Sequence, residues 1–181
     1  KDNGYDISDY YGVDPRHGSS GEFVEFMHQA KKRGIKVIMD LVVNHTSDEH
    51  PWFKDARSRK DAPRRDWYVW SDKKPSDWDE GMVFPGVQKA TWTRDKKSGS
   101  YYHHRFHAFQ PDLNIDNAEV RAEIRRTMGY WIELGVEGFR ISGDELVLRD
   151  RSDLAAVVVG QMPVQRPLEL LEERAERLGN E

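Results

Sequence analysis

Charged side chains lie inside two apolar runs, where they could take part in chemistry. Asp40 lies in the run KVIMDLVVNH at 36–45, which ends in His45. Arg140 lies in the run VEGFRI at 136–141. A charge in an apolar run is costly unless it is hydrogen-bonded or paired, so the arginine needs an anion. Polar groups at the carboxyl ends of parallel strands are often functional, although a buried, satisfied aspartate and a loop-entry histidine are the alternative.

The first apolar run follows a helix signal. Ser19 and Glu22 match a capping box, and Gly34 is a helix-stop glycine. A strand within 36–45, covered on both faces as in a parallel sheet, is then predicted. The apolar stripe of the helix has helical spacing and consists of Phe23, Phe26, Met27 and Ala30.

The second apolar run repeats this order. Asp116 or Asn117 would cap a helix, and Glu119 would complete its capping box. The helical stripe consists of Val120, Ile124, Met128, Trp131 and Leu134. The strand at 136–141 follows it. Successive αβ units with apolar strands imply an α/β fold with a parallel sheet and right-handed crossovers.

Residues 46–117 have a different character. They contain five of the six tryptophans among Pro, Asp, Lys and Gly, with no sustained period over most of their length. Such a span is too long for an ordinary loop and predicts a small inserted domain or a folded lid. The aromatic residues would form either a miniature core, which is the commoner use, or stacking platforms for a ligand. A hairpin turn is predicted at 96–100, and the histidines nearby suggest no metal site.

Composition bounds the function. The 181 residues are 37% hydrophobic with a net charge of −4, which gives no basic surface for nucleic acid. No apolar stretch approaches the roughly 20 residues that cross a bilayer, so no membrane partner is expected. The lack of cysteine excludes disulfides and thiolate metal sites and is compatible with a cytoplasmic location. The chain starts with Lys rather than Met, and its first residues look like the middle of a longer sequence.

Four motifs together carry a resemblance to a known family. They are DNGYDISDY at 2–10, DLVVNHTSDEH at 40–50, QPDLN at 110–114 and GFRI at 138–141. In this order and spacing the chain resembles the α-amylase superfamily of glycoside hydrolases and transglycosidases. The form QPDLN is similar to the branch that contains oligo-1,6-glucosidase, other α-glucosidases and trehalose synthase.

The resemblance implies part of a TIM (β/α)8 barrel. Residues 1–45 would be partial catalytic barrel, 46–117 a domain inserted between strand three and helix three, and 118–142 helix three and strand four. A whole barrel typically takes about 250 residues. Residues 143–181 do not continue the family's sequence. In this divergent tail, two short strands are predicted at 144–149 and 154–159, and an amphipathic helix at 166–178.

The resemblance also implies roles for residues at the barrel mouth. Asp2 would hydrogen-bond hydroxyls of the bound glucose, and Tyr5 would stack on its ring. His45 would contact the primary hydroxyl, and Asp40 would support the site. Arg140 would hold the nucleophilic carboxylate in its ionised form. The substrate would be an α-glucoside or maltose-type sugar, and no cofactor is expected.

The chain departs from the family at the nucleophile. The family has Asp two residues after the arginine, whereas this chain has Ser142. Retaining chemistry needs two carboxyl groups about 5 Å apart, and a serine without a paired base is a poor substitute. Asp144 would share the strand face but would lie two residues, or roughly 6 to 7 Å, beyond the position of the nucleophile, so it is not expected to replace it.

Two hypotheses follow from this departure. One is a fragment of an α-glucoside-acting enzyme that is inactive as given. The other is a non-catalytic relic that binds sugar or serves as an interaction fragment. Apolar strand and helix faces without barrel neighbours would promote self-association.

Overall fold

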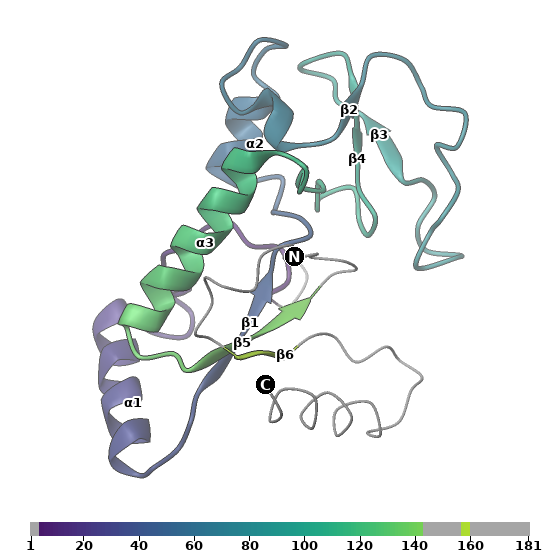
Figure 1. The fold of residues 1–181 in the computed structure, drawn as a ribbon. Helices are drawn as coiled ribbons and strands as arrows, with labels where there is room; N and C mark the ends of the chain where they lie inside the picture. Colours follow the sequence, from purple (N-terminus) through teal and green to yellow (C-terminus); the bar gives the residue numbers. More distant parts are fainter. Residues whose placement is uncertain (1–3, 143–156, 160–181) are drawn as a thin grey trace, which may run out of the picture.

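The computed structural model describes residues 4–142 and 157–159, and its strands form two separate sheets (Figure 1). The larger sheet has the order β1-β5-β6, and both of its strand pairs are parallel. Its strands are β1 (Ile38–Val42), β5 (Gly138–Ser142) and β6 (Val157–Val159). The predicted parallel α/β arrangement is therefore confirmed for these strands, although β1 and β5 each begin two residues later than the apolar runs suggested.

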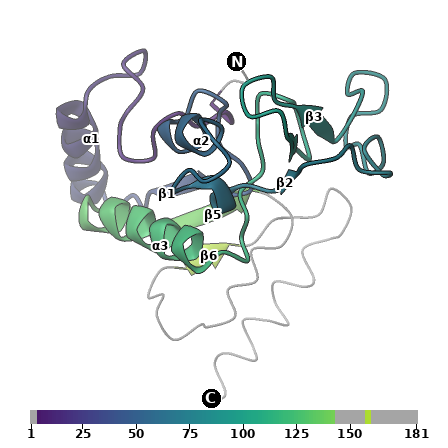
Figure 2. The same cartoon turned by 90° about the horizontal axis from the view of Figure 1, so that it is seen from above.

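Two helices pack against one face of this sheet. Helix α1 (Ser20–Lys32) precedes β1, and helix α3 (Ala118–Glu133) precedes β5. Both lie on the same side of the strands in the two views (Figures 1 and 2). Between helices and sheet lies the main core, which includes Met27, Leu41, Ile124, Met128, Trp131, Phe139 and Ile141. Burial of this apolar area is the main stabilising contribution to the αβ part.

The helix signals are mostly confirmed. The side chain of Ser19 accepts from the backbone of Glu22, and the Glu22 carboxylate accepts in return, so the capping box is present. Asn117 caps α3 through its side chain. The second capping box is wrong, because the Glu119 carboxylate instead accepts from Trp67 Nε1 at 2.9 Å. The prediction that Phe26 faces the core is also wrong, because this residue is 53% exposed.

Residues 46–117 contain the second sheet. It is antiparallel with the order β2-β4-β3, in which β3 (Trp92–Arg94) and β4 (Tyr101–His103) form the predicted hairpin. The other elements are β2 (Trp70–Ser71), α2 (Pro51–Ala56) and the short 3-10 helix η1 (Arg65–Trp67). Trp67 is buried in the core, and Trp52 and Trp70 pack against it. For these three tryptophans the core interpretation is the right one.

The structure tests only a small part of the predictions for the tail. Within the predicted strand at 154–159, Val157–Val159 is β6. The predicted strand at 144–149 and the helix at 166–178 lie outside the described residues. Among the residues that are described, no helix has both the length and the apolar character needed to cross a bilayer.

Candidate functional site

The site is centred on an ion pair between neighbouring strands. The parallel register places Asp40 of β1 opposite Arg140 of β5. Arg140 Nη1 donates to both Asp40 carboxylate oxygens, at 2.8 and 3.1 Å. The two side chains are 38% and 55% exposed. The alternative interpretation of Asp40 as a buried aspartate is therefore wrong. The anion that Arg140 needs is Asp40 on the adjacent strand.

Strand alternation explains why this pair is accessible. Leu41 and Phe139 point into the core, so their neighbours Asp40 and Arg140 lie on the opposite face of the sheet. That face is open in the described part of the chain, where Ile38 is 56% exposed. The prediction that β1 is covered on both faces is wrong here, because the helices pack only on one of them.

Tyr5 joins the ion pair from a segment near the start of the chain. Its hydroxyl lies 3.5 Å from Asp40 Oδ2, a long hydrogen bond, and the residue is 41% exposed. A hydrogen bond with Tyr5 and the negative charge of Asp40 raise the pKa of Arg140. Three segments that are remote in sequence thus meet at one exposed, polar and aromatic surface. Such a surface can stack on a ring and exchange hydrogen bonds with hydroxyl groups.

His45 lies beneath this surface rather than on it. It is 4% exposed, and its Nε2 lies 2.9 Å from the backbone carbonyl oxygen of Tyr5. The Phe106 ring packs edge-on against the imidazole with centroids 5.3 Å apart. The Tyr10 hydroxyl donates toward the carbonyls of Val42 and His45 at 2.8 and 3.0 Å, which secures the turn after β1. The predicted site residues Tyr5 and His45 are therefore in contact, through backbone and ring.

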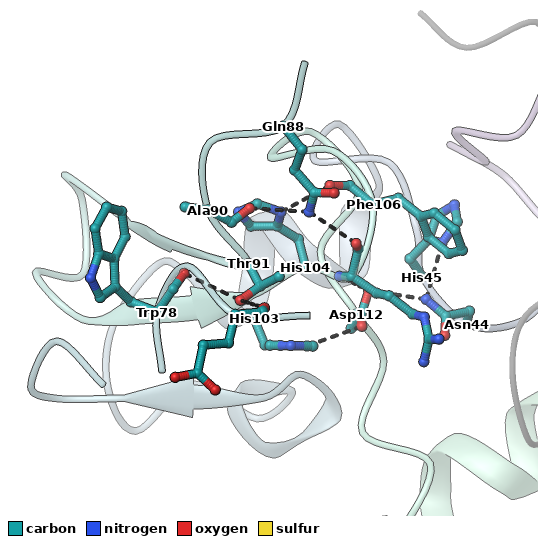
Figure 3. Close-up of polar contacts among 12 residues, drawn as sticks. Asn44, His45, Trp78, Gln88, Ala90, Thr91, His103, His104, Phe106 and Asp112 are labelled. Atoms are coloured by element: carbon teal, nitrogen blue, oxygen red, sulfur yellow. Dashed lines mark hydrogen bonds and ion pairs between the residues drawn. The ribbon is translucent and has the colours of Figure 1, made fainter. Parts of the chain in front are cut away.

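Asp112 is a residue whose place at the site the sequence did not indicate. It lies in the QPDLN motif, is 8% exposed, and bridges the turn after β1 to the β3–β4 hairpin (Figure 3). Its carboxylate accepts from Asn44 Nδ2 at 3.0 Å and lies 3.0 Å from His103 Nδ1. Because Asn44 and Asp112 are 68 positions apart, no local pattern could have paired them.

Two other predicted site residues are not placed with these. Asp2 lies outside the described residues. Ser142 is the last residue of β5, where its backbone is in register with Val42. Within the described ranges, no group of three or more His, Asp or Glu residues is arranged to hold a metal ion.

Comparisons with known proteins agree on one family. Residues 1–159 match the family described as alpha amylase, catalytic domain. The chain is 45% identical to a trehalose synthase of Pimelobacter over 141 residues, and 46% identical to an oligo-1,6-glucosidase of Parageobacillus thermoglucosidasius over 144 residues. These matches cover 78% and 77% of this chain but 25% of each relative. The chain thus spans about a quarter of the length of these relatives.

Solved structures give the same result. The trehalose-6-phosphate hydrolase of Bacillus licheniformis superposes with a TM-score of 0.72 at 46% identity, covering 78% of this chain and 25% of that one. An inactive double mutant of MutB in complex with isomaltulose gives a TM-score of 0.71 at 42% identity, with the same coverages.

Proposed function

The chain belongs to the α-amylase catalytic-domain family, and from this premise we propose that it forms part of the sugar site of an enzyme that acts on α-glucosidic bonds. The relatives are a trehalose synthase, an oligo-1,6-glucosidase and a trehalose-6-phosphate hydrolase, so the substrate would be an α-glucoside or a maltose-type sugar. The observation that supports this best is the convergence of Tyr5, Asp40 and Arg140 on one exposed surface.

Each residue has a role in this proposal. The exposed Tyr5 ring stacks on the glucose, and the Asp40–Arg140 pair offers hydrogen bonds to its hydroxyls. His45, expected to contact the primary hydroxyl, lies beneath this surface and instead supports it through the backbone of Tyr5, while Asp2 contacts further hydroxyls. Residues 46–117 act as an inserted domain between the first barrel segment, 1–45, and the second, 118–142. Of the tail at 143–181, which was expected to diverge, the family match includes the part up to residue 159.

We further propose that the chain as given does not catalyse glycosyl transfer. Ser142 stands where the family has its nucleophilic aspartate, and Arg140 bonds to Asp40. A retaining enzyme needs a second carboxyl group about 5 Å from the first. The second candidate is therefore a non-catalytic sugar-binding or interaction relic. That a relative has been solved as an inactive mutant in complex with isomaltulose supports separating binding from turnover.

Maltose titration tests the binding proposal. Changes in tryptophan fluorescence should give a dissociation constant near 1 mM, or about −4 kcal/mol. Tyr5→Ala should abolish the change because it removes the stacking ring, whereas Tyr5→Phe keeps the ring and should retain most of the affinity. If the spectrum of the wild-type chain stays flat up to high maltose concentration, the sugar-site proposal fails.

Ser142→Asp tests the catalytic proposal. Aspartate restores an anion near Arg140, but turnover also needs a general acid, which is worth roughly 100- to 10,000-fold in rate. We expect a slow burst of nitrophenol from 4-nitrophenyl α-glucoside, whose leaving group needs little protonation, and no release of glucose from maltose. Steady turnover of maltose by this variant would show that the chain supplies an acid and would refute the proposed inactivity.

Self-association is a further expectation of the partial-barrel proposal. Two apolar side chains around the start of β1, Ile35 and Ile38, are 55% and 56% exposed. Exposed apolar groups of this kind promote association. Light scattering of the purified chain should show oligomers, and a monomer with a sharp cooperative melt would contradict the partial barrel.

A further inference from the structure

Asp112 lies at the junction between the turn after β1 and the β3–β4 hairpin. Three donor groups face its nearly buried carboxylate (Figure 3). They are Asn44 Nδ2 at 3.0 Å, the backbone N–H of Arg105 at 3.1 Å and His103 Nδ1 at 3.0 Å. An ionised carboxylate only accepts hydrogen bonds, so each of these groups must present a hydrogen to it.

This requirement fixes the orientation of the Asn44 amide. Its NH₂ group, and not its oxygen, must point toward Asp112. The same nitrogen lies 3.3 Å from His45 Nδ1. One amide hydrogen therefore goes to Asp112, and the other faces the imidazole of His45, whose Nδ1 must act as the acceptor.

The protonation of His45 follows from that contact. A neutral imidazole has one N–H and one bare nitrogen, so a bare Nδ1 places the hydrogen on Nε2. Nε2 lies 2.9 Å from the carbonyl oxygen of Tyr5, which can only accept. One tautomer thus satisfies these two contacts, and the Nε2–H group holds the backbone of Tyr5, whose hydroxyl reaches Asp40.

We propose that Asp112 is a positioning residue: by orienting Asn44 it acts together with the Tyr5 carbonyl to favour the Nε2–H tautomer of His45, and thereby helps to hold Tyr5 at the ion pair. The roles implied by the family resemblance do not include Asp112. The arrangement couples the β3–β4 hairpin to Tyr5 without any direct contact between Asp112 and that side chain. Its consequence for sugar binding rests on the proposed function, whereas the tautomer of His45 does not.

A purely structural role for Asp112 would have a different signature. If Asp112 only attached the hairpin to the core, any comparable loosening of the hairpin would have the same effect on His45. Asp95 provides the matched control, because it is a buried carboxylate of the same hairpin that bonds to Arg57 and to the backbone of Ser98. Its hydrogen bonds involve neither Asn44 nor His45.

The test is a long-range ¹H–¹⁵N spectrum of the full chain labelled at its histidine nitrogens, recorded near pH 7. His45→Gln identifies the His45 signals by their loss. In the wild-type chain we expect Nδ1 to have the shift of a bare nitrogen and Nε2 that of a protonated one. In Asp112→Ala, Asn44 can turn its oxygen toward Nδ1 and compete with the Tyr5 carbonyl for the ring hydrogen, so the two shifts should move toward their average.

Two variants separate positioning from attachment. Asp112→Asn keeps an acceptor oxygen for Asn44 and should retain the wild-type tautomer, while Asp95→Asn should leave the His45 signals unchanged. Asn44→Ala removes the donor to Nδ1 and leaves the Tyr5 carbonyl to favour Nε2–H, so its shifts should move in the same direction but less far, and it decides the question if Asp112→Ala does not fold. Wild-type shifts in Asn44→Ala, or an equal change in Asp95→Asn, would overturn the proposal.

Maltose titration of the same variants links the inference to function. Asp112→Ala should weaken maltose binding at least tenfold, and Asp112→Asn should weaken it less. If the tautomer responds as expected but the wild-type chain binds no maltose, the positioning role stands and the proposed sugar site fails. If maltose binds and the tautomer does not respond to either Asp112→Ala or Asn44→Ala, the positioning role fails alone.

Discussion

The αβ part and the segment 46–117 are stabilised in different ways. The buried side chains of α1, β1, α3 and β5 are almost all apolar, as in the packing of Met27, Met128 and Phe139. The segment 46–117 buries many polar side chains, among them Gln88, Thr91, Asp95, Ser100, His104, Gln110 and Asp112. The αβ part therefore depends mainly on buried apolar area, whereas the segment 46–117 combines an aromatic core with many satisfied buried hydrogen bonds. The exposed ion pair lies on the apolar αβ part, while the polar contacts that we propose to position Tyr5 come from the segment 46–117.

The largest expected effect is loss of core packing in the αβ part. Phe139 is fully buried, so Phe139→Ala should reduce the free energy of unfolding by about 3 to 5 kcal/mol. Phe26→Ala is the control, because Phe26 is 53% exposed and its removal should cost less than about 1 kcal/mol. Urea unfolding followed by tryptophan fluorescence measures both. Equal costs would mean that α1 packs with Phe26 inward, as the sequence pattern suggested.

The next effect is a pH dependence in the second region. Burial lowers the pKa of His50 from 6.5 to about 4, and its Nδ1 accepts from the backbone N–H of Trp52 at the start of α2. Because the unfolded chain takes up the proton more readily, stability is lost as the pH falls from about 6.5 to about 4. The full loss is about 3 kcal/mol, since one pKa unit corresponds to about 1.4 kcal/mol.

His50→Asn separates the titration from the helix cap. Asparagine can cap α2 but does not titrate, so the decline of unfolding free energy over this pH range should become shallower. Urea unfolding of both chains at several pH values measures the slopes. An unchanged slope in His50→Asn would assign the titration to other groups.

A smaller loss of folding stability is expected when Asp95, a buried carboxylate of the hairpin, is replaced by asparagine. Burial alone would raise the pKa of Asp95, but hydrogen bonds from the Ser98 backbone and the Arg57 side chain outweigh it and lower that pKa. Its stabilising contribution is therefore present above the ordinary aspartate pKa of 3.8 and is lost at more acid pH. Asp95→Asn should cost about 2 kcal/mol at pH 7, as expected for hydrogen bonds to a charged group.

Asp61→Asn is the matched control for Asp95→Asn. Asp61 pairs with Arg59, but its side chain is 85% exposed, so solvent screens the pair. Thermal unfolding of this variant at pH 7 should be close to that of the wild-type chain. A cost as large as that of Asp95→Asn would remove the distinction between buried and exposed carboxylates in this segment.

The smallest effect on stability is expected at the site itself. Asp40→Asn disrupts the ion pair with Arg140, but both side chains are exposed and contribute little to folding. The melting temperature should therefore stay within experimental error while maltose binding is lost. A large fall in melting temperature would show that the ion pair belongs to the structural core of the sheet.

Much of the fold could be predicted from local patterns. The capping box at Ser19, the Asn117 cap and the turn of the β3–β4 hairpin each depend on residues a few positions apart. The predictions were wrong where tertiary packing, rather than local spacing, determines the contacts of a side chain. Helical spacing placed Phe26 in the apolar stripe, yet spacing cannot determine how wide a stripe the neighbouring elements will cover. Glu119 had the spacing of a capping box, but Trp67, 52 positions away, holds its carboxylate.

Short motifs were enough to predict the family, the two αβ units and most of the residues proposed to bind sugar. Three features became visible only in the folded chain: which face of β1 is open, that Asp40 is the anion of Arg140, and that Asp112 faces Asn44. These contacts join residues 100 and 68 positions apart. They exist because parallel strand register and hairpin placement bring remote backbone segments together, and neither is encoded in any local period of the chain.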